Sequence, residues 1–212
     1  MSESLIIGII LTVVGGYLDT YTYVSRGGVF ANAQTGNIVF LGIKLAQGRW
    51  NEMLEFIFPI FAFSLGVLIA LYIRNKWGES TKIHWRQWTL VIEISVLIIV
   101  AFIPSGNIDN LVNTLISFVC AIQVVSFRKI QGNIMATTMC TGNLRTGSEL
   151  LYYGIISKDK TKIKSASIYF IIIAFFIFGA TLGMLLTSQL GTHSSLVPAV
   201  LLSINVILLN FR

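Results

Sequence analysis

Six long apolar runs dominate this sequence, and they restrict its possible folds more than any other feature. Each approaches the roughly 20 residues that a helix needs to cross a bilayer. They cover residues 5–25, 54–73, 88–103, 111–127, 166–188 and 196–211. Only 11% of the 212 residues are charged, whereas soluble domains carry about 25%. The pattern predicts an all-α polytopic membrane protein with one transmembrane domain, residues 1–212, and excludes a soluble enzyme and a disordered chain.

Two stretches interrupt this pattern, residues 27–48 and 130–154. Both are too polar and glycine-rich for ordinary spans and too apolar for ordinary loops. Each contains the tripeptide Thr-Gly-Asn, at residues 35–37 and 141–143. We interpret them as re-entrant or broken segments, because irregular backbone at membrane depth must be satisfied by protein or water.

The second and fifth apolar runs are similar to each other. Residues 60–70 (IFAFSLGVLIA) and 177–187 (IFGATLGMLLT) are identical at five of eleven positions. Together with the repeated tripeptide, this similarity predicts two three-helix repeats, residues 1–106 and 107–212. An odd number of spans per repeat makes the repeats inverted, an architecture typical of secondary transporters.

The basic residues predict the orientation. With two re-entrant segments and both termini in the cytoplasm, Arg26, Lys44 and Arg49 lie outside. The cytoplasmic side then holds Arg74, Lys76, Lys82, Arg86, Arg128, Lys129, Arg145, Lys158, Lys160, Lys162, Lys164 and Arg212. This asymmetry follows the positive-inside rule and places the protein in the cell (inner) membrane. The net charge of +6 is thereby explained without a nucleic-acid partner. If both segments crossed fully, the eight resulting spans would lose the asymmetry.

Asp19 is an acidic residue inside the first apolar run. It lies on a helical face of small and polar residues that includes Gly15, Thr22 and Arg26. A carboxylate at a helix centre costs about 2.5–3.5 kcal/mol on insertion scales. One interpretation is a proton-titratable or cation-binding site that lines a pathway. The alternative is a structural carboxylate that caps the re-entrant segment or pairs with Arg26.

The two Thr-Gly-Asn motifs can build a polar site. Glycine permits a close turn, threonine can cap the following helix, and the N–H groups of a helix start suit an anion. Alternatively, the asparagines only tie the broken segments to neighbouring helices. The candidate substrate- or ion-binding residues are Asp19, Asn32, Gln34, Thr35, Gly36, Asn37, Gln123, Thr138, Thr141, Gly142, Asn143 and Arg145. Arg145 can instead be a surface cation, and we expect Glu93 near the interface or beside a basic group.

No catalytic or metal-binding constellation is recognisable. His84 and His193 stand alone, and Cys120 and Cys140 match no metal spacing. We therefore expect no enzyme activity, no metal and no cofactor.

The motifs resemble those of the YoaK-like family of bacterial membrane proteins, a domain of unknown function. The first signature is GYLDT (16–20) followed by FANAQTGN (30–37), and the second is QVVSFR (123–128) followed by TTMCTG (137–142). Thr20, Gln34 and Val124 stand where the family usually has Ala, Met and Asn. The resemblance implies the fold and topology and supplies no substrate.

These features favour a small secondary transporter. We expect a homodimer in the lipid bilayer that moves a small polar or anionic solute through a midplane site between the repeats, with H⁺ or Na⁺ as the coupling ion at Asp19. A passive channel for a small solute and a non-transport assembly or sensory protein are the alternatives.

Overall fold

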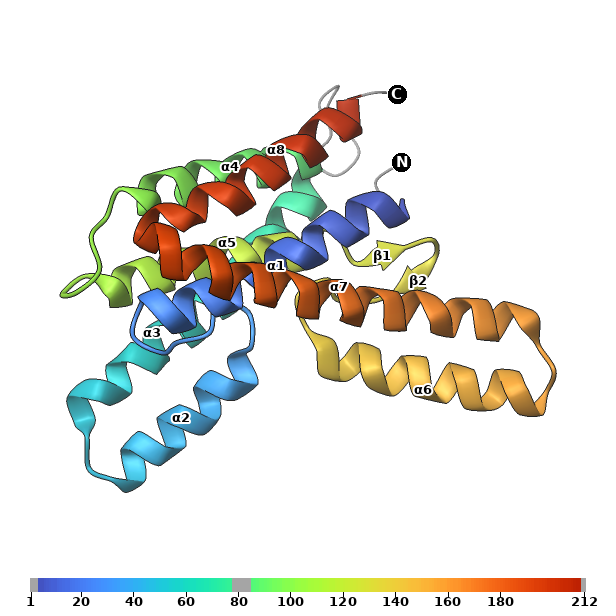
Figure 1. The fold of residues 1–212 in the computed structure, drawn as a ribbon, viewed down its shortest axis with the longest axis horizontal. Coiled ribbons are helices and arrows are strands. Elements are labelled where there is room, and N and C mark those ends of the chain that lie inside the picture. Colours follow the sequence, from blue (N-terminus) through green and yellow to red (C-terminus); the bar gives the residue numbers. More distant parts are fainter. Residues whose placement is uncertain (1–3, 78–84, 211–212) are drawn as a thin grey trace.

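The computed structural model describes residues 4–77 and 85–210, with the side chains of Trp77 and Asn210 left out. This part of the chain is almost entirely helical (Figure 1). The α-helices are α1 (Leu5–Ser25), α2 (Gln34–Ala46), α3 (Trp50–Trp77), α4 (Trp85–Ala101), α5 (Asp109–Ser126), α6 (Cys140–Ile156), α7 (Lys160–Leu190) and α8 (Leu196–Asn210). Strands β1 (Lys129–Ile130) and β2 (Asn133–Ile134) form a short hairpin after α5, and the 3₁₀-helix η1 (Gly191–Ser195) joins α7 to α8.

The all-helical prediction is confirmed. Helices α1, α3, α4, α5, α7 and α8 coincide with the six apolar runs, whereas α2 and α6 occupy the two polar interruptions. Helix α7 begins at Lys160, six residues before its apolar run, because the Asp159 carboxylate accepts hydrogen bonds from the N–H groups of Thr161 and Lys162. This is an N-cap that allows helix to extend beyond the apolar sequence.

Four described segments are long and apolar enough to cross a membrane. They are Leu5–Ser25, Trp50–Lys76, Asp109–Ser126 and Lys160–Leu209, the last of which runs through α7, η1 and α8. The remaining predicted span, α4, has 17 residues, slightly fewer than the roughly 20 of a typical span.

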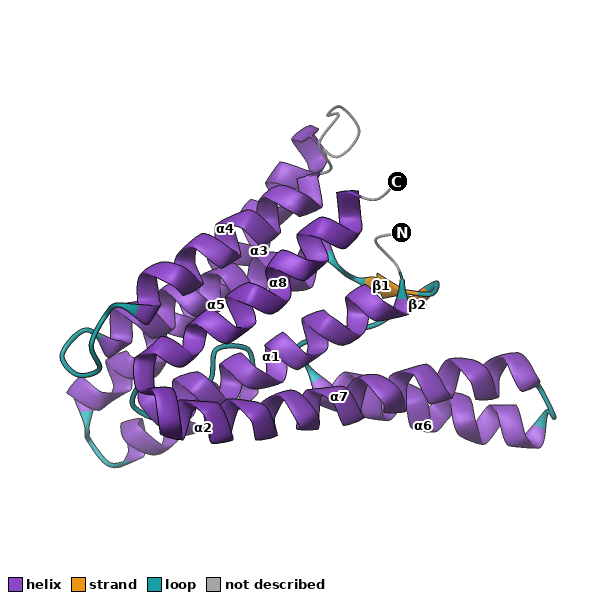
Figure 2. Cartoon of the chain, turned by 45° about the horizontal axis from the view of Figure 1, so that its top comes forward, coloured by secondary structure: helices purple, strands orange, loops and turns teal. Residues whose placement is uncertain are grey.

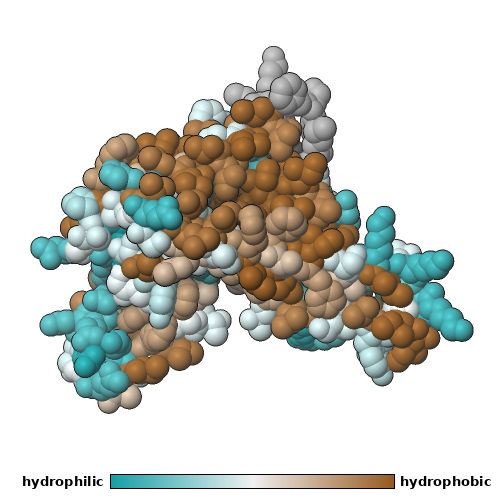
Figure 3. All heavy atoms as spheres, in the orientation of Figure 1, coloured by the Kyte–Doolittle hydropathy of each residue, from teal (hydrophilic) through white to brown (hydrophobic). Residues whose placement is uncertain are grey.

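The helices pack in pairs. Helix α1 lies along α7, α3 along α5 and α4 along α8, while α2 and α6 fold back on α3 and α7. Figure 2 shows the start of α1, the end of α8 and the β-hairpin at one end of the bundle, and the α6–α7 hairpin extending away from the bundle. The apolar surface in Figure 3 covers the bundle, and hydrophilic residues gather at the tips of the α2–α3 and α6–α7 turns. This distribution suits a helix bundle surrounded by lipid.

Glycines let the paired helices approach to backbone contact. A Cβ atom at Gly179 of α7 would collide with the backbone of Val13 in α1, and one at Gly16 with the backbone of Phe176. Gly66 of α3 faces the carbonyl of Phe118 in α5 in the same way. Close approach through small residues is the usual way in which helices associate in membranes, where the hydrophobic effect between helices is absent.

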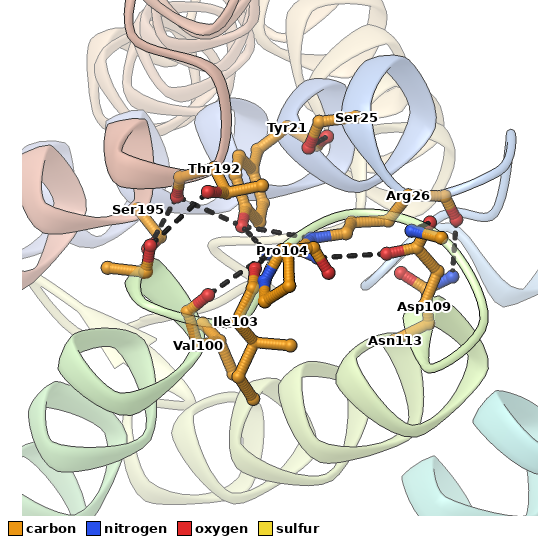
Figure 4. A network of polar contacts seen from close by, with 12 residues as sticks. Tyr21, Ser25, Arg26, Val100, Ile103, Pro104, Asp109, Asn113, Thr192 and Ser195 are labelled. Carbon is orange, nitrogen blue, oxygen red and sulfur yellow. Dashed lines mark hydrogen bonds and ion pairs between the residues drawn. The ribbon is translucent and has the colours of Figure 1, made fainter.

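Arg26 organises the end of the bundle opposite the chain termini (Figure 4). Its side chain is fully buried and forms an ion pair of 2.8 Å with Asp109 at the start of α5. It also donates to the Tyr21 hydroxyl and to the carbonyls of Val100, Ile103 and Pro104. The partner of Arg26 is therefore Asp109, and the suggested pairing with Asp19 is wrong. A buried guanidinium is tolerated only where its donors are satisfied in this way.

We expect Gly179→Ala to destabilise the protein by about 1–3 kcal/mol, the usual cost of overpacking, because its methyl group meets the α1 backbone. Gly42→Ala in α2 is the matched control, since a Cβ atom there meets nothing within 4 Å. The measurement is the midpoint of thermal unfolding in detergent micelles. Equal midpoints for the two variants would contradict the close α1–α7 contact.

Candidate functional site

The Asp19 carboxylate anchors the chain that returns toward the middle of α1. Its Oδ1 atom accepts hydrogen bonds from the backbone N–H groups of Asn32 (2.6 Å) and Ala33 (3.3 Å). Gly27 and Gly28 have φ angles of 83° and 79°, a conformation that glycine adopts without steric cost. The chain thus reverses after α1 and begins α2 beside Asp19, and this carboxylate holds the two residues that precede α2.

The two asparagines of the Thr-Gly-Asn motifs make the same pair of hydrogen bonds. Asn37 accepts from the Phe30 N–H (2.9 Å) and donates to the Phe30 carbonyl (2.7 Å). Asn143 does the same with Ala136, at 3.3 and 2.6 Å. Each amide therefore ties the first turn of its helix to a residue seven positions earlier.

The expected capping by the motif threonines is wrong. The N-cap residues of α2 and α6 are Ala33 and Met139, and neither helix has a side-chain capping bond. Thr35 and Thr141 instead lie in the second helical position, because both helices begin one residue before the motif.

The starts of α2 and α6 face one cavity of about 550 Å³. Asp19 and Thr20 of α1 contribute to its wall, and Phe63, Phe176 and Ala180 close it from α3 and α7. Seven of the predicted site residues line it, namely Asp19, Asn32, Gln34, Thr35, Thr138, Thr141 and Gly142. The volume lies within the range of small-molecule sites.

Polar atoms at this cavity lack protein partners. Within the described residues, the Asn32 Oδ1 and Thr138 Oγ1 atoms are buried and accept or donate no hydrogen bond. Buried polar atoms in proteins are nearly always satisfied. Two residues of the cavity wall thus have polar atoms that the protein itself leaves unsatisfied.

The other predicted residues do not line the cavity. Gly36 packs against the Phe30 ring, and Asn37 and Asn143 are occupied by the backbone bonds described above. Arg145 is exposed on α6 and pairs with Glu149 at 2.9 Å, since its helix position directs it away from the cavity.

Gln123 belongs to a second buried polar cluster with Glu93. Oriented to satisfy its neighbours, the Gln123 amide nitrogen donates to both Glu93 carboxylate oxygens, at 2.8 and 3.0 Å. Glu93 is only 1% exposed, and no basic side chain pairs with it in the described residues. Glu93 is therefore buried in the helix bundle with an amide as its partner.

A second hollow of about 350 Å³ lies on the other side of the α6 start. It shares Met139 and Gly142 with the first cavity and reaches Arg128 and Ile134 beside the β-hairpin. Residues 4–77 and 85–210 contain no group of three metal-ligating side chains. The groups that the Asp19 cavity offers to a ligand are a carboxylate, hydroxyls, amides and helix N–H groups.

Comparison with known proteins identifies relatives without an assigned activity. The profile of the family described as "Protein of unknown function (DUF1275)" matches residues 7–208. The chain is 25% identical over 142 residues to the UPF0700 transmembrane protein YoaK of Bacillus subtilis (strain 168). This alignment covers 64% of the chain and 61% of the relative. The match thus spans less than two thirds of that relative's length, and no solved structure matches the chain. The YoaK-like resemblance and the transmembrane character are confirmed.

We expect N-ethylmaleimide to modify Cys140 and to leave Cys120 unmodified. Cys140 is partly exposed at the cavity, whereas Cys120 is buried within the core. The measurement is intact-protein mass spectrometry of the native chain in detergent, with Cys140→Ala as the variant that should lose the label and Cys120→Ala as the variant that should retain it. Labelling of Cys120 alone would contradict an accessible cavity at the α6 start.

Proposed function

Because the chain belongs to the DUF1275 family of proteins of unknown function, we propose its function from the site itself: a small secondary transporter for a small polar or anionic solute, coupled to a cation through Asp19. The observation that carries this proposal is the single cavity that contains Asp19 and the first residues of both α2 and α6. The same cavity argues against a purely structural assembly or sensory role, which requires no such space.

The proposal includes two inverted repeats, α1–α4 and α5–α8. Asn37 and Asn143 make equivalent pairs of hydrogen bonds, each with the residue seven positions earlier, and this supports the repeats. The helix pairing supports them too, because the first helix of each repeat packs on the third helix of the other: α1 on α7, and α5 on α3. The ion pair between Arg26, after the end of α1, and Asp109, at the start of α5, supports opposite directions for these two helices. Inverted repeats give a transporter two related conformations, open to either side.

We take α2 and α6 as re-entrant. Both occupy the polar, glycine-rich interruptions between the apolar runs. Both begin at the Asp19 cavity, and each packs along the helix that follows it, so each would enter and leave on one side. Their first N–H groups would then point at mid-membrane, where they favour an anion or another polar solute.

Asp19 would couple the solute to a proton. An ionised carboxylate repels an anion in the same cavity, whereas the protonated form removes that repulsion and adds a donor. A proton and an anion therefore bind together at lower cost than either alone. Na⁺ at the carboxylate would serve equally well, and Glu93 offers a second buried acidic group in the core.

A homodimer completes the proposal, because six spans form a thin wall around a pathway. The cell membrane, with both termini in the cytoplasm, is the corresponding location, as the distribution of basic residues predicts.

We expect Asp19→Asn to slow solute-driven proton movement. Proteoliposomes with an internal pH dye receive gradients of formate, acetate, lactate, succinate and inorganic phosphate, with or without Na⁺. The active anion should acidify the lumen, and Asp19→Asn should slow this at least about tenfold, equivalent to about 1.4 kcal/mol in the barrier. Glu149→Gln, an exposed carboxylate on α6, is the control.

Saturation and counterflow separate the carrier from the channel. Unsaturated flux that Asp19→Asn leaves unchanged would indicate the passive channel, and the absence of flux for the whole panel would refute a coupled anion carrier.

A further inference from the structure

A third cavity, of about 370 Å³, opens at the end of the bundle that holds the chain termini and the β-hairpin. Four basic side chains line it, from three separate elements. Arg74 comes from the last turns of α3, Arg86 from the start of α4, and Arg128 and Lys129 from the segment that leaves α5. No acidic residue is among the described residues that line it.

Arg86 gives this cavity a fixed anchor. Its Nε atom donates to the Ser126 carbonyl at 2.8 Å, and its guanidinium lies 5.6 Å from the centre of the Trp85 ring. Backbone contact and cation–π contact hold the planar group in one orientation. The positive charge of Arg86 is therefore fixed at the wall of the cavity.

The other three cations are exposed and available. In the part of the chain that the structure describes, Arg74, Arg128 and Lys129 form no ion pair. Like charges gathered around one hollow repel each other. A bound anion would convert that repulsion into attraction.

We propose that this cavity binds a phosphate group. Guanidinium groups form paired hydrogen bonds with phosphate oxygens, and lysine adds a point charge. The volume exceeds that of a bare phosphate and leaves room for an attached organic group. The ligand is either a soluble phosphate compound or the headgroup of an anionic phospholipid, since basic pockets between membrane helices on the cytoplasmic side bind such headgroups.

The position of the cavity suits both sources. Trp85 opens α4 at this level, and tryptophan is enriched at membrane–water interfaces. Arg128 also borders the second hollow, so a soluble anion could reach the same residues from the side of the central cavity.

The test is binding to the purified full chain in detergent, which is independent of transport. Trp50, Trp77 and Trp88 are replaced by Phe, so that Trp85 alone reports by its fluorescence. One arm adds inorganic phosphate and a second adds short-chain phosphatidylglycerol. Short-chain phosphatidylcholine, whose zwitterionic headgroup has no net charge, is the comparison. Saturable binding of phosphate identifies a soluble ligand, and selective binding of phosphatidylglycerol identifies a lipid.

Arg128→Gln with Lys129→Gln should weaken binding at least about tenfold in Kd. Lys158→Gln with Lys160→Gln removes the same charge at the α6–α7 turn and should leave Kd unchanged. Arg74→Gln is a milder second variant, and circular dichroism checks that each variant is folded. If neither phosphate nor phosphatidylglycerol binds, or if the control pair weakens binding equally, the site does not exist. This binding assay does not depend on transport. A failure of the proposed transport function and a failure of the phosphate site can therefore be distinguished.

Discussion

The structure depends on satisfying backbone polar groups where helices break inside an apolar bundle. Each buried N–H or carbonyl without a partner costs about 1–3 kcal/mol, and lipid offers none. After α1, the Asp19 carboxylate takes the N–H groups of Asn32 and Ala33, and Asn37 takes both polar groups of Phe30. After α5, Asn143 does the same for Ala136. These few side chains make it possible for α2 and α6 to start within the protein, and so create the cavity between them.

Sequence reasoning identified most of the helices because length and hydropathy alone determine a membrane span. The run at residues 5–25 coincides with α1, and the last run differs from α8 by one residue. The errors lie where polar residues continue a helix beyond its apolar run. Asp159 starts α7 early through its capping bonds, and Trp85 starts α4 before the apolar residues begin. Hydropathy gives no signal for such helix extensions, whereas capping residues such as Asp159 do indicate where a helix begins.

Some residues of the candidate site could be predicted from the sequence, whereas their hydrogen-bond partners could not. A carboxylate in an apolar helix is costly, so Asp19 was conspicuous, and the repeated motif drew attention to the neighbouring segments. The partners were not predictable, because the bond from Asn37 to Phe30 depends on a turn whose path no periodicity describes. The Gln123 amide could not be predicted as the partner of Glu93, because the two residues lie on different helices. Arg145 was included because its helix face could not be derived from the tripeptide alone.

The cationic end of the bundle changes how the central cavity should be understood. Its basic residues are far apart in sequence, from Arg74 to Lys129, and only folding brings them together. The second hollow shares Met139 and Gly142 with the Asp19 cavity and Arg128 and Ile134 with the basic cavity. Negative charge at Asp19 and positive charge at Arg128 thus bound the same series of hollows. In the transporter that we propose, an anion would be attracted at the basic end and repelled at the other until Asp19 is protonated, so protonation would be the step that admits the anion to the middle of the protein.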